Sequence, residues 1–487
     1  CFFFEKPLLC TTMMHRLVKA AAVVLGCAWL CAAAVPEHLI RDLPGIDNAQ
    51  IKFKQYAGYV TVNEAKGRNF FYWFVESQNS PATDPLLLWL NGGPGSSSLI
   101  GFFVEHGPFR NEKNGVNLTL NPYAWNRVAN VLYVESPSYV GFSYSGDAGD
   151  WKTDDDTVAA DNYEFVRRWL ALYPEYRKND FYVTGESYGG HYVPELCEQI
   201  LEKDTRGEIN LRGLMAGNAA VNSDWYELGT ADPRTDAWSF LTFMHTHGIV
   251  PHAAYAAAAE QCGWAHYASD CAGNYTRPSA ACLAATTAAL AYIPDDIDIY
   301  NVDAPACLDD AALSYTRRWS LAARVVAARR AHKRADSADF DPCAFSHMVA
   351  YLNRADVQAA IHARAGTKWS GFADLDYSAE SMHRNIIPLF EKFLATPRAQ
   401  RWRILVYSGD ADAAVPFLGT QKWVHCLGRP VKRDWRPWYH NRQFAGSVID
   451  YDGITFMTVH GSGHAIPWYT PALGFEFYQR WLLGKDF

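Results

Sequence analysis

The chain has 487 residues, of which 49% are hydrophobic, 20% are charged and 14% are aromatic. A composition this rich in aromatic residues excludes disorder for most of the chain and predicts a large buried core. Lysine and arginine number 44 against 52 acidic residues, and the net charge of −8 gives no indication of nucleic acid as a partner.

An apolar run near the N-terminus, Ala20–Val35, follows the basic residues Arg16 and Lys19. The run is shorter than a membrane span, which needs about 20 residues. The pattern is typical of a secretory signal peptide, so we expect residues 1–34 to form a leader that is cleaved near Ala34; the alternative is an uncleaved anchor. No later stretch is apolar enough to cross a membrane, and we expect no membrane span once the leader is removed.

Seven of the 11 cysteines lie beyond the expected leader, at positions 197, 262, 271, 282, 307, 343 and 426. A secreted chain meets oxidising conditions, so these residues can form disulfides, but an odd number cannot all pair within one chain. Two glycosylation sequons, which begin at Asn117 and Asn274, agree with the same compartment.

Strand and helix patterns alternate through residues 35–220. The run Leu86–Leu90, within a predicted strand at 85–90, is continuously apolar, as expected of a strand that is buried on both faces. Apolar residues recur at helical spacing from Asp156 to Tyr173, where Pro174 ends the predicted helix. The other predicted elements are strands at 56–62, 69–76, 130–136, 181–184 and 211–216 and a helix at 193–201. This alternation predicts an α/β fold with a mostly parallel sheet and helices on both of its faces.

The pattern changes between residues 221 and 346, which are rich in alanine and show no clear strand. We interpret this segment as a helical cap insertion over the sheet. The core resumes over residues 347–487, with strands predicted at 403–407 and 454–459 and a final helix at 472–483. The expected organisation is therefore one interrupted core, and not three domains in series.

The motif Gly185-Glu186-Ser187-Tyr188-Gly189 follows a predicted strand and begins a predicted helix. This is the context of a G-x-S-x-G nucleophile elbow, in which small flanking residues allow a sharp turn that presents the serine hydroxyl. The motif alone recurs by chance, but its place between a strand and a helix makes Ser187 a good candidate nucleophile.

A serine nucleophile needs a base and an acid that orients the base, and in this type of fold the acid and then the histidine follow the serine along the chain. His464 comes just after the strand that ends at Val459, and Asp410 and Asp412 come just after the strand at 403–407. Open α/β sheets place their sites at these carboxyl ends of strands. From the residues alone, either Asp410 or Asp412 could be the acid.

The reaction also needs donors for the oxyanion of the tetrahedral intermediate. The segment Asn91-Gly92-Gly93-Pro94-Gly95 follows a predicted strand and is a natural source of backbone N–H groups, unless it is simply a turn. Tyr188, the residue after the nucleophile, would supply the second N–H.

Together these motifs resemble the serine carboxypeptidase family, a lysosomal, vacuolar and secreted branch of the α/β-hydrolases. The resemblance runs from about Ile46 to the C-terminus, and its motifs are WLNGGPG at 89–95, GESYGGHYVP at 185–194, GDAD at 409–412 and GSGH at 461–464. It implies an α/β-hydrolase fold with a helical cap. It also implies Ser187 as the nucleophile, His464 as the base, Asp412 as the acid, and the N–H groups of Gly93 and Tyr188 as the oxyanion donors.

The resemblance further implies a device that binds the terminal carboxylate of the substrate, made of Asn91, the backbone of Gly92, Glu186 and Glu105. An ionised glutamate would repel a carboxylate, but two adjacent carboxyl groups raise each other's pKa, and the protonated one can donate a hydrogen bond. We therefore expect peptide binding to weaken as the pH rises. The alternative for Glu105 is a surface charge at a helix end.

Cysteine usage departs from the family pattern. Ser96 stands where relatives carry the usual partner of Cys343, so we expect Cys343 to be unpaired. We expect two bridges within the cap, with the pairing left open, and buried free thiols at Cys197 and Cys426. The bridges would form among Cys262, Cys271, Cys282 and Cys307. A run of seven basic residues within 317–334 is either a solvated helix face or a segment that is cut during maturation.

The family resemblance implies a serine-type carboxypeptidase that releases C-terminal residues from peptides and proteins through an acyl-enzyme on Ser187, favoured at acidic pH. It implies no cofactor, no metal and no nucleic-acid partner, and no histidine cluster has metal-ligand spacing. The expected location is the lysosome, the vacuole or the extracellular space, and a homodimer is compatible with it. Two alternatives stay open: an acyltransferase that uses the same triad, and a binding or protective partner whose catalysis is incidental.

Overall fold

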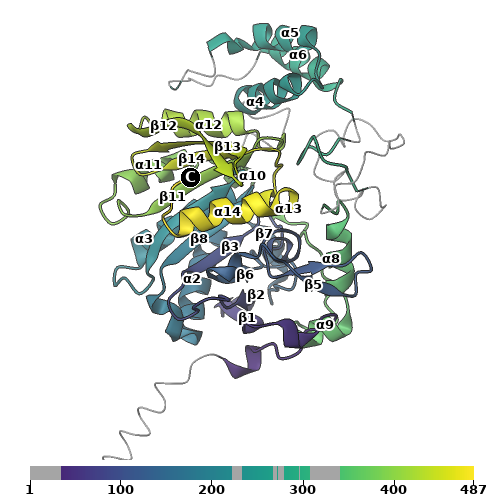
Figure 1. The fold of residues 1–487 in the computed structure, drawn as a ribbon, viewed down its shortest axis with the longest axis vertical. Coiled ribbons are helices and arrows are strands. Elements are labelled where there is room, and N and C mark those ends of the chain that lie inside the picture. The colour runs from purple at the N-terminus through teal and green to yellow at the C-terminus, as the bar shows by residue number, and fades with distance from the viewer. Residues whose placement is uncertain (1–34, 222–232, 267–270, 272–278, 295–296, 308–339) are drawn as a thin grey trace, which may run out of the picture.

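The computed structural model describes residues 35–221, 233–266, 271, 279–294, 297–307 and 340–487 (Figure 1). The expected leader, the sequon at Asn274 and the basic segment 317–334 lie outside these ranges. Within them, no helix combines the length and the apolar character that a membrane span requires.

A ten-stranded sheet forms the centre of the molecule (Figure 1). Its six middle strands run parallel, and antiparallel strands complete both sides. In spatial order the strands are β1 (Gln55–Asn63), β2 (Arg68–Val75), β6 (Asn130–Val134), β3 (Leu86–Leu90), β8 (Phe181–Glu186), β9 (Leu211–Gly217), β11 (Arg403–Gly409), β14 (Thr455–Val459), β13 (Gln443–Tyr451) and β12 (Val431–His440). Two small sheets pair β4 (Phe109–Asn111) with β5 (Leu118–Leu120), and β7 (Lys152–Thr153) with β10 (Asp376–Tyr377).

Helices cover both faces of the sheet, because alternate residues of each buried strand face opposite layers. One layer contains α2 (Asp155–Leu172), α3 (Gly189–Lys203), α11 (Ile387–Ala395) and α12 (Phe417–Cys426). The other contains α8 (Ala344–Leu352), α9 (Ala355–Ala360), α14 (Pro471–Leu482) and a π-helical turn, η3 (Gly101–Glu105). Two short helices, α10 (Ala379–Met382) and α13 (Ile466–Tyr469), lie in loops. The predicted fold class, a mostly parallel sheet between two helical layers, is confirmed.

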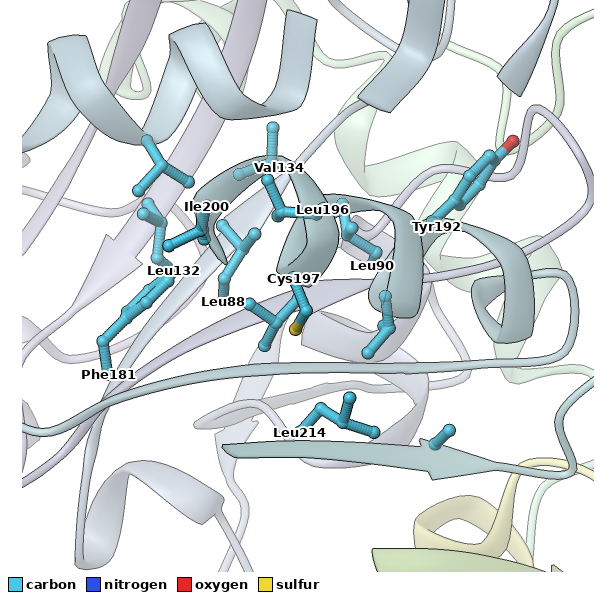
Figure 2. Close-up of a cluster of buried hydrophobic side chains, with 14 of the residues drawn as sticks. Leu88, Leu90, Leu132, Val134, Phe181, Tyr192, Leu196, Cys197, Ile200 and Leu214 are labelled. Atoms are coloured by element: carbon cyan, nitrogen blue, oxygen red, sulfur yellow. The ribbon is translucent and has the colours of Figure 1, made fainter. Parts of the chain in front are cut away.

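The packing under α3 determines where the candidate elbow lies. Figure 2 shows Leu88 and Leu90 of β3 in one cluster with Leu196 and Ile200 of α3, and all four side chains are buried. Burial of a leucine or isoleucine side chain contributes about 1.5–3 kcal/mol, so a few such contacts fix the helix on the sheet. The turn that precedes α3 is therefore carried by a rigid element.

The sequence patterns did not predict the hairpin of β12 and β13 at the edge of the sheet. Strand β12 is mostly exposed and reads VKRDWRPWYH, with charged residues where a buried strand would be apolar. An edge strand that faces water needs no apolar alternation, and its charges and Pro437 are typical of protected sheet edges.

Helix α3 begins at Gly189, four residues before the predicted start at Val193, and it contains Pro194.

Helices α4 (Pro233–Thr246), α5 (His252–Cys262) and α6 (Ala280–Leu290) gather at one end of the molecule, next to α12 (Figure 1). They share a small apolar cluster that includes Leu241 and Met244 of α4 and also Ala413 from the core. The described part of 221–346 thus contains these three α-helices and a non-helical segment at 297–307, and the limits of the cap stay a prediction.

Three disulfides correct the expected cysteine pairing. Cys262–Cys282 joins α5 to α6, but Cys271 pairs with Cys426 and Cys307 pairs with Cys343. The expectation that Cys262, Cys271, Cys282 and Cys307 pair among themselves is wrong, as are the expectations of an unpaired Cys343 and a free Cys426. Cys426 can reach Cys271 because α4 packs on α12, which ends at Cys426. Cys197 is buried and free, as expected, and it is the odd thiol.

Alkylation of the unreduced, unfolded protein with iodoacetamide should modify Cys197 alone among the seven cysteines beyond residue 34. In the folded protein Cys197 should resist the reagent, because it is fully buried and burial raises the pKa of its thiol. Peptide mass spectrometry reads both results, with the reduced protein as the control for complete labelling. A labelled Cys426 or Cys343 in the unreduced sample would contradict the pairing.

Candidate active site

Ser187 lies in a tight turn between β8 and α3. Its φ of 60° is in the left-handed region, which a non-glycine residue adopts only where the surroundings enforce it. The Ser187 N–H donates to the carbonyl of Gly217 at 3.0 Å, and the N–H groups of Gly190 and Ala220 donate to the Ser187 carbonyl at 2.8 and 3.0 Å. The serine remains partly exposed. The strand–turn–helix context predicted from the motif is present.

His464 and Asp412 lie in loops after the neighbouring strands β14 and β11. The ring nitrogen Nδ1 of His464 is 2.8 Å from Oδ2 of Asp412, and both residues are buried. The N–H groups of Ala414 and Val415 also donate to the Asp412 carboxylate, at 2.7 and 3.2 Å. The other ring nitrogen, Nε2, is buried and has no hydrogen-bond partner among the described residues. This nitrogen remains available to accept a proton.

Asp410 has a different role from Asp412. Its carboxylate accepts the N–H of Gly461 at 2.7 Å and pairs with Nδ1 of His460, also at 2.7 Å. Asp410 therefore closes the loop that leads to His464 and does not contact His464. Of the two aspartates that the sequence left open, the structure brings Asp412 to the histidine.

The glycine-rich loop after β3 packs directly against the elbow. A Cβ atom on Gly92 would overlap the backbone nitrogen of Tyr188 and the side chain of Ser187, so only glycine fits there. The hydroxyl of Tyr192 on α3 accepts the N–H of Gly95 at 3.3 Å and ties the end of the loop to the same helix. The two candidate oxyanion donors, Gly93 and Tyr188, thus belong to segments that touch.

Asn91, Glu186 and Glu105 form a buried cluster beside the loop. The side-chain amide of Asn91 donates to Oε1 of Glu105 and to Oε1 of Glu186, both at 2.9 Å. The Asn91 oxygen in turn accepts the indole N–H of Trp89 at 2.8 Å and the N–H of Gly101 at 3.0 Å, which fixes the orientation of the amide. The predicted carboxylate-binding residues are therefore together in the fold.

Burial raises the pKa of both glutamates. Burial, reinforced by the charge and the hydrogen bond of Glu105, raises the pKa of Glu186 well above its usual value. Burial also raises the pKa of Glu105, but Asn91, Glu186 and the positive charge of Arg110 oppose that rise. Both carboxyl pKa values are thus raised, that of Glu186 more strongly, which favours a state in which the pair keeps a proton.

Glu105 is the last residue of the π-helical turn η3 and is fully buried, so the alternative of a surface charge is wrong. Arg110 donates hydrogen bonds to the backbone carbonyls of Glu105 and Phe103 and holds the end of this turn. Burial lowers the pKa of the Arg110 guanidinium to about 10. Single π-helical turns are rare in proteins, but those that occur are often found at functional sites. This one directs Glu105 toward Asn91.

Sequence patterns missed Asn218, which follows β9. Its side-chain amide donates to Oδ2 of Asp412 at 2.6 Å, and its own oxygen accepts the N–H of Gly409 at 3.3 Å. The signal that could have found it is its place at the carboxyl end of a central strand, next to the elbow strand.

Segment 299–302, within the predicted cap, also contacts the candidate site, and no sequence pattern predicted this contact. The carbonyl of Tyr300 accepts the N–H of His464 at 2.7 Å, and the two rings lie 5.1 Å apart. The carbonyl of Ile299 accepts the N–H groups of Ala413 and Ala414 at 2.9 and 3.0 Å. This segment therefore holds the loops of Asp412 and His464 together through its backbone.

A family model described as serine carboxypeptidase matches residues 44–484 of the chain. The chain belongs to the serine carboxypeptidase family. It is 37% identical over 459 residues to "Serine carboxypeptidase 24" of Arabidopsis thaliana, a match that covers 92% of each chain. It is 38% identical over 459 residues to "Serine carboxypeptidase-like 26" of Oryza sativa subsp. japonica, and this match covers 92% of the chain and 90% of the relative.

A solved prohormone-processing carboxypeptidase from Saccharomyces cerevisiae has the same fold. It superposes with a TM-score of 0.72 at 19% sequence identity, over 93% of this chain and 96% of the yeast chain. This likeness confirms the α/β-hydrolase fold that the motifs implied. The family match likewise confirms a serine-type carboxypeptidase as the class of enzyme.

Replacing Asn218 by glycine should lower kcat/KM for a blocked dipeptide by about tenfold, because a buried hydrogen bond to a charged group contributes about 1.5–3 kcal/mol. Glycine tolerates the positive φ of 41° at this position, so the backbone is not strained. Asn179→Ala is the matched control, since Asn179 is also buried but donates to the carbonyls of Pro81 and Asp84. Equal kcat/KM values in Asn218→Gly and wild type would show that Asn218 does not support Asp412.

Proposed function

We propose that this protein removes C-terminal residues from peptides and proteins at acidic pH, through an acyl-enzyme on Ser187. The observation that carries the proposal is the buried group of Asn91, Glu186 and Glu105 beside the elbow. A general esterase has no need of such a device. An exopeptidase needs one, because it must recognise a free terminal carboxylate.

In the acylation step, the hydroxyl oxygen of Ser187 attacks the carbonyl carbon of the last peptide bond, and Nε2 of His464 accepts the hydroxyl proton. Asp412 stabilises the resulting imidazolium through its 2.8 Å contact with Nδ1. The N–H groups of Gly93 and Tyr188 donate to the oxyanion. His464 then gives its proton to the departing amine, the C–N bond breaks, and the terminal amino acid leaves.

In the deacylation step, water attacks the ester carbonyl while Nε2 of His464 takes one of its protons. The ester C–O bond breaks, the shortened peptide leaves with a new carboxylate, and Ser187 recovers its proton from His464. Every proton transfer passes through one nitrogen, which the Asp412 contact keeps in place.

The carboxylic acid of Glu186 is a neutral donor for the substrate's terminal carboxylate, and the amide of Asn91 becomes a second one when the substrate carboxylate replaces one glutamate as its acceptor. Asn91 already donates to both glutamates, so its amide lies at the centre of the group. The proton on Glu186 removes the repulsion between two carboxylates, and the charge of Arg110 stabilises the ionised Glu105. Acidic pH favours this protonated state.

A secretory location fits the three disulfides, which form in oxidising compartments. We propose the lysosome, the vacuole or the extracellular space as the site of action. Asn117 is exposed next to β5 and is accessible for glycosylation.

Ser187→Ala should reduce the release of amino acid from an N-blocked dipeptide at about pH 5 to background, a loss of about 10⁵-fold or more. The amidated dipeptide should be a poor substrate of the wild type, because it lacks the carboxylate.

Addition of an alcohol or amine acceptor to the assay distinguishes hydrolysis from acyl transfer, since a transferase would pass most acyl groups to the acceptor. Release that is equal in Ser187→Ala and wild type would refute the peptidase proposal.

KM for a free-acid peptide should rise as the pH increases from about 5 to about 8, because loss of the Glu186 proton leaves two carboxylates facing the substrate carboxylate. Glu186→Gln keeps a neutral donor that cannot ionise, so its KM should change little over the same range. Wild-type affinity for a blocked amino-acid amide, which carries no carboxylate, is the control and should not follow the pH. A Glu186→Gln variant with the wild-type pH dependence of KM would contradict the assignment.

A further inference from the structure

A second buried polar cluster, which the proposed chemistry does not use, lies behind the elbow. It contains Asp155 at the start of α2 and His191 and Glu195 on α3, and these side chains are almost completely shielded from solvent. The carboxylate of Asp155 accepts the hydroxyl of Tyr377 at 2.6 Å and the hydroxyl of Tyr188 at 3.1 and 3.3 Å. It also pairs with Nδ1 of His191 at 3.0 Å.

The cluster has the residue types of a metal site, since one ligand atom from each of Asp155, His191 and Glu195 falls within 4.8 Å of the others. Both oxygens of Asp155 already accept hydrogen bonds, however, and Arg384 donates to Glu195 at 3.2 Å. Burial raises the pKa of Glu195 to about 9, which favours its neutral form. Oε2 of Glu195 has no hydrogen-bond partner among the described residues, but Tyr188, His191 and Tyr377 satisfy the Asp155 carboxylate without a cation.

The residue that links this network to the site is Tyr188. Its ring is stacked on His191, with centroids 4.3 Å apart, and meets Tyr377 edge-on at 5.6 Å. Its backbone nitrogen lies at the other end of the residue, against Gly92 in the oxyanion loop. A side chain that is fixed by stacking and by Asp155 leaves the backbone of Tyr188 little freedom to rotate.

We propose that Asp155 is a positioning residue for the reaction: through the Tyr188 hydroxyl, it holds the Ser187–Tyr188 peptide with its N–H directed at the oxyanion. The inference rests on the proposed function, in which that N–H is a donor. Asp155 itself contacts neither the substrate nor the reacting atoms. It can hold Tyr188 because it is itself held by His191 and by the Ser381 hydroxyl, which accepts its backbone N–H at 3.1 Å.

Loss of a whole oxyanion donor lowers kcat by about 10²–10³-fold. If the donor stays in place but points less directly at the oxyanion, the fall in kcat should be smaller, about tenfold, with little change in KM. An interaction that acts only in the transition state has this signature.

The test compares Tyr188→Phe with Tyr377→Phe in the full-length protein. Each variant keeps its ring and loses one hydroxyl bond to the same buried carboxylate, so a general loss of stability should affect both, whereas only Tyr188 belongs to the elbow. For Tyr188→Phe we expect kcat for a blocked dipeptide to fall about tenfold while KM stays within about twofold. Its affinity for a peptide aldehyde, which forms a tetrahedral adduct with the serine, should fall by a similar factor. Tyr377→Phe should stay within about twofold of wild type in all three quantities.

Three results would overturn the proposal: unchanged kcat in Tyr188→Phe, an equal fall in both variants, or a change confined to KM. The aldehyde affinities distinguish a failure of the positioning role from a failure of the proposed function. If the wild type released no amino acid, the proposed function would fail, and the two aldehyde affinities would still decide whether Asp155 acts through Tyr188. Equal aldehyde affinities in the two variants, with normal peptide release by the wild type, would reject the positioning role alone.

Discussion

Two carboxyl groups that share one buried site resist carrying a charge at the same time, and much of the structure around the elbow follows from this constraint. Glu186 keeps its proton because burial and Glu105 disfavour its ionised form. Asn91 can donate to both glutamates only because Trp89 and the N–H of Gly101 fix its oxygen on the opposite side. The π-helical turn at Gly101–Glu105 is thus tied to the site at both ends, by a backbone bond to Asn91 and by the Glu105 side chain.

The loops that carry the candidate catalytic residues all begin at the carboxyl ends of adjacent strands. Strands β3, β8, β9, β11 and β14 carry Asn91, Ser187, Asn218, Asp412 and His464 respectively, and their order in the sheet places the serine and the histidine on opposite sides of Asn218. Asn218 is therefore in a position to bond Asp412 from the serine side. The Tyr300 carbonyl accepts the backbone N–H of His464, so segment 299–302 also holds the histidine loop.

Local chemistry made much of this site predictable. A glycine-flanked serine between a strand and a helix, followed in order by an aspartate and a histidine at strand ends, has few physical explanations, and the core elements were found because buried strands and amphipathic helices have distinct periods. The choice of Asp412 over Asp410 needed either the family resemblance or the structure, because both aspartates follow the same strand.

Features that depend on how distant segments pack were not predictable. Cys271–Cys426 requires the cap to rest on α12, and nothing in the spacing of the cysteines specifies that contact. The backbone bonds of 299–302 to the catalytic loops have no side-chain signature. Strand β12 was missed for a different reason, because an exposed edge strand lacks the apolar alternation by which strands are recognised.

The strained conformation of Ser187 explains why so many of these contacts converge on one turn. A positive φ at a non-glycine residue relaxes unless its neighbours are fixed on every side. Here the apolar face of α3 packs on the sheet, and Gly92 lies in close contact with the turn. The backbone of Ser187 also makes hydrogen bonds with Gly217, Gly190 and Ala220. Asp155 fixes the Tyr188 side chain on the remaining side, where its buried carboxyl accepts hydrogen bonds from Tyr188 and Tyr377 and pairs with His191. A buried carboxylate is costly unless all of its neighbours are in place, so this arrangement commits α2, α3 and β10 to a single geometry around the nucleophile.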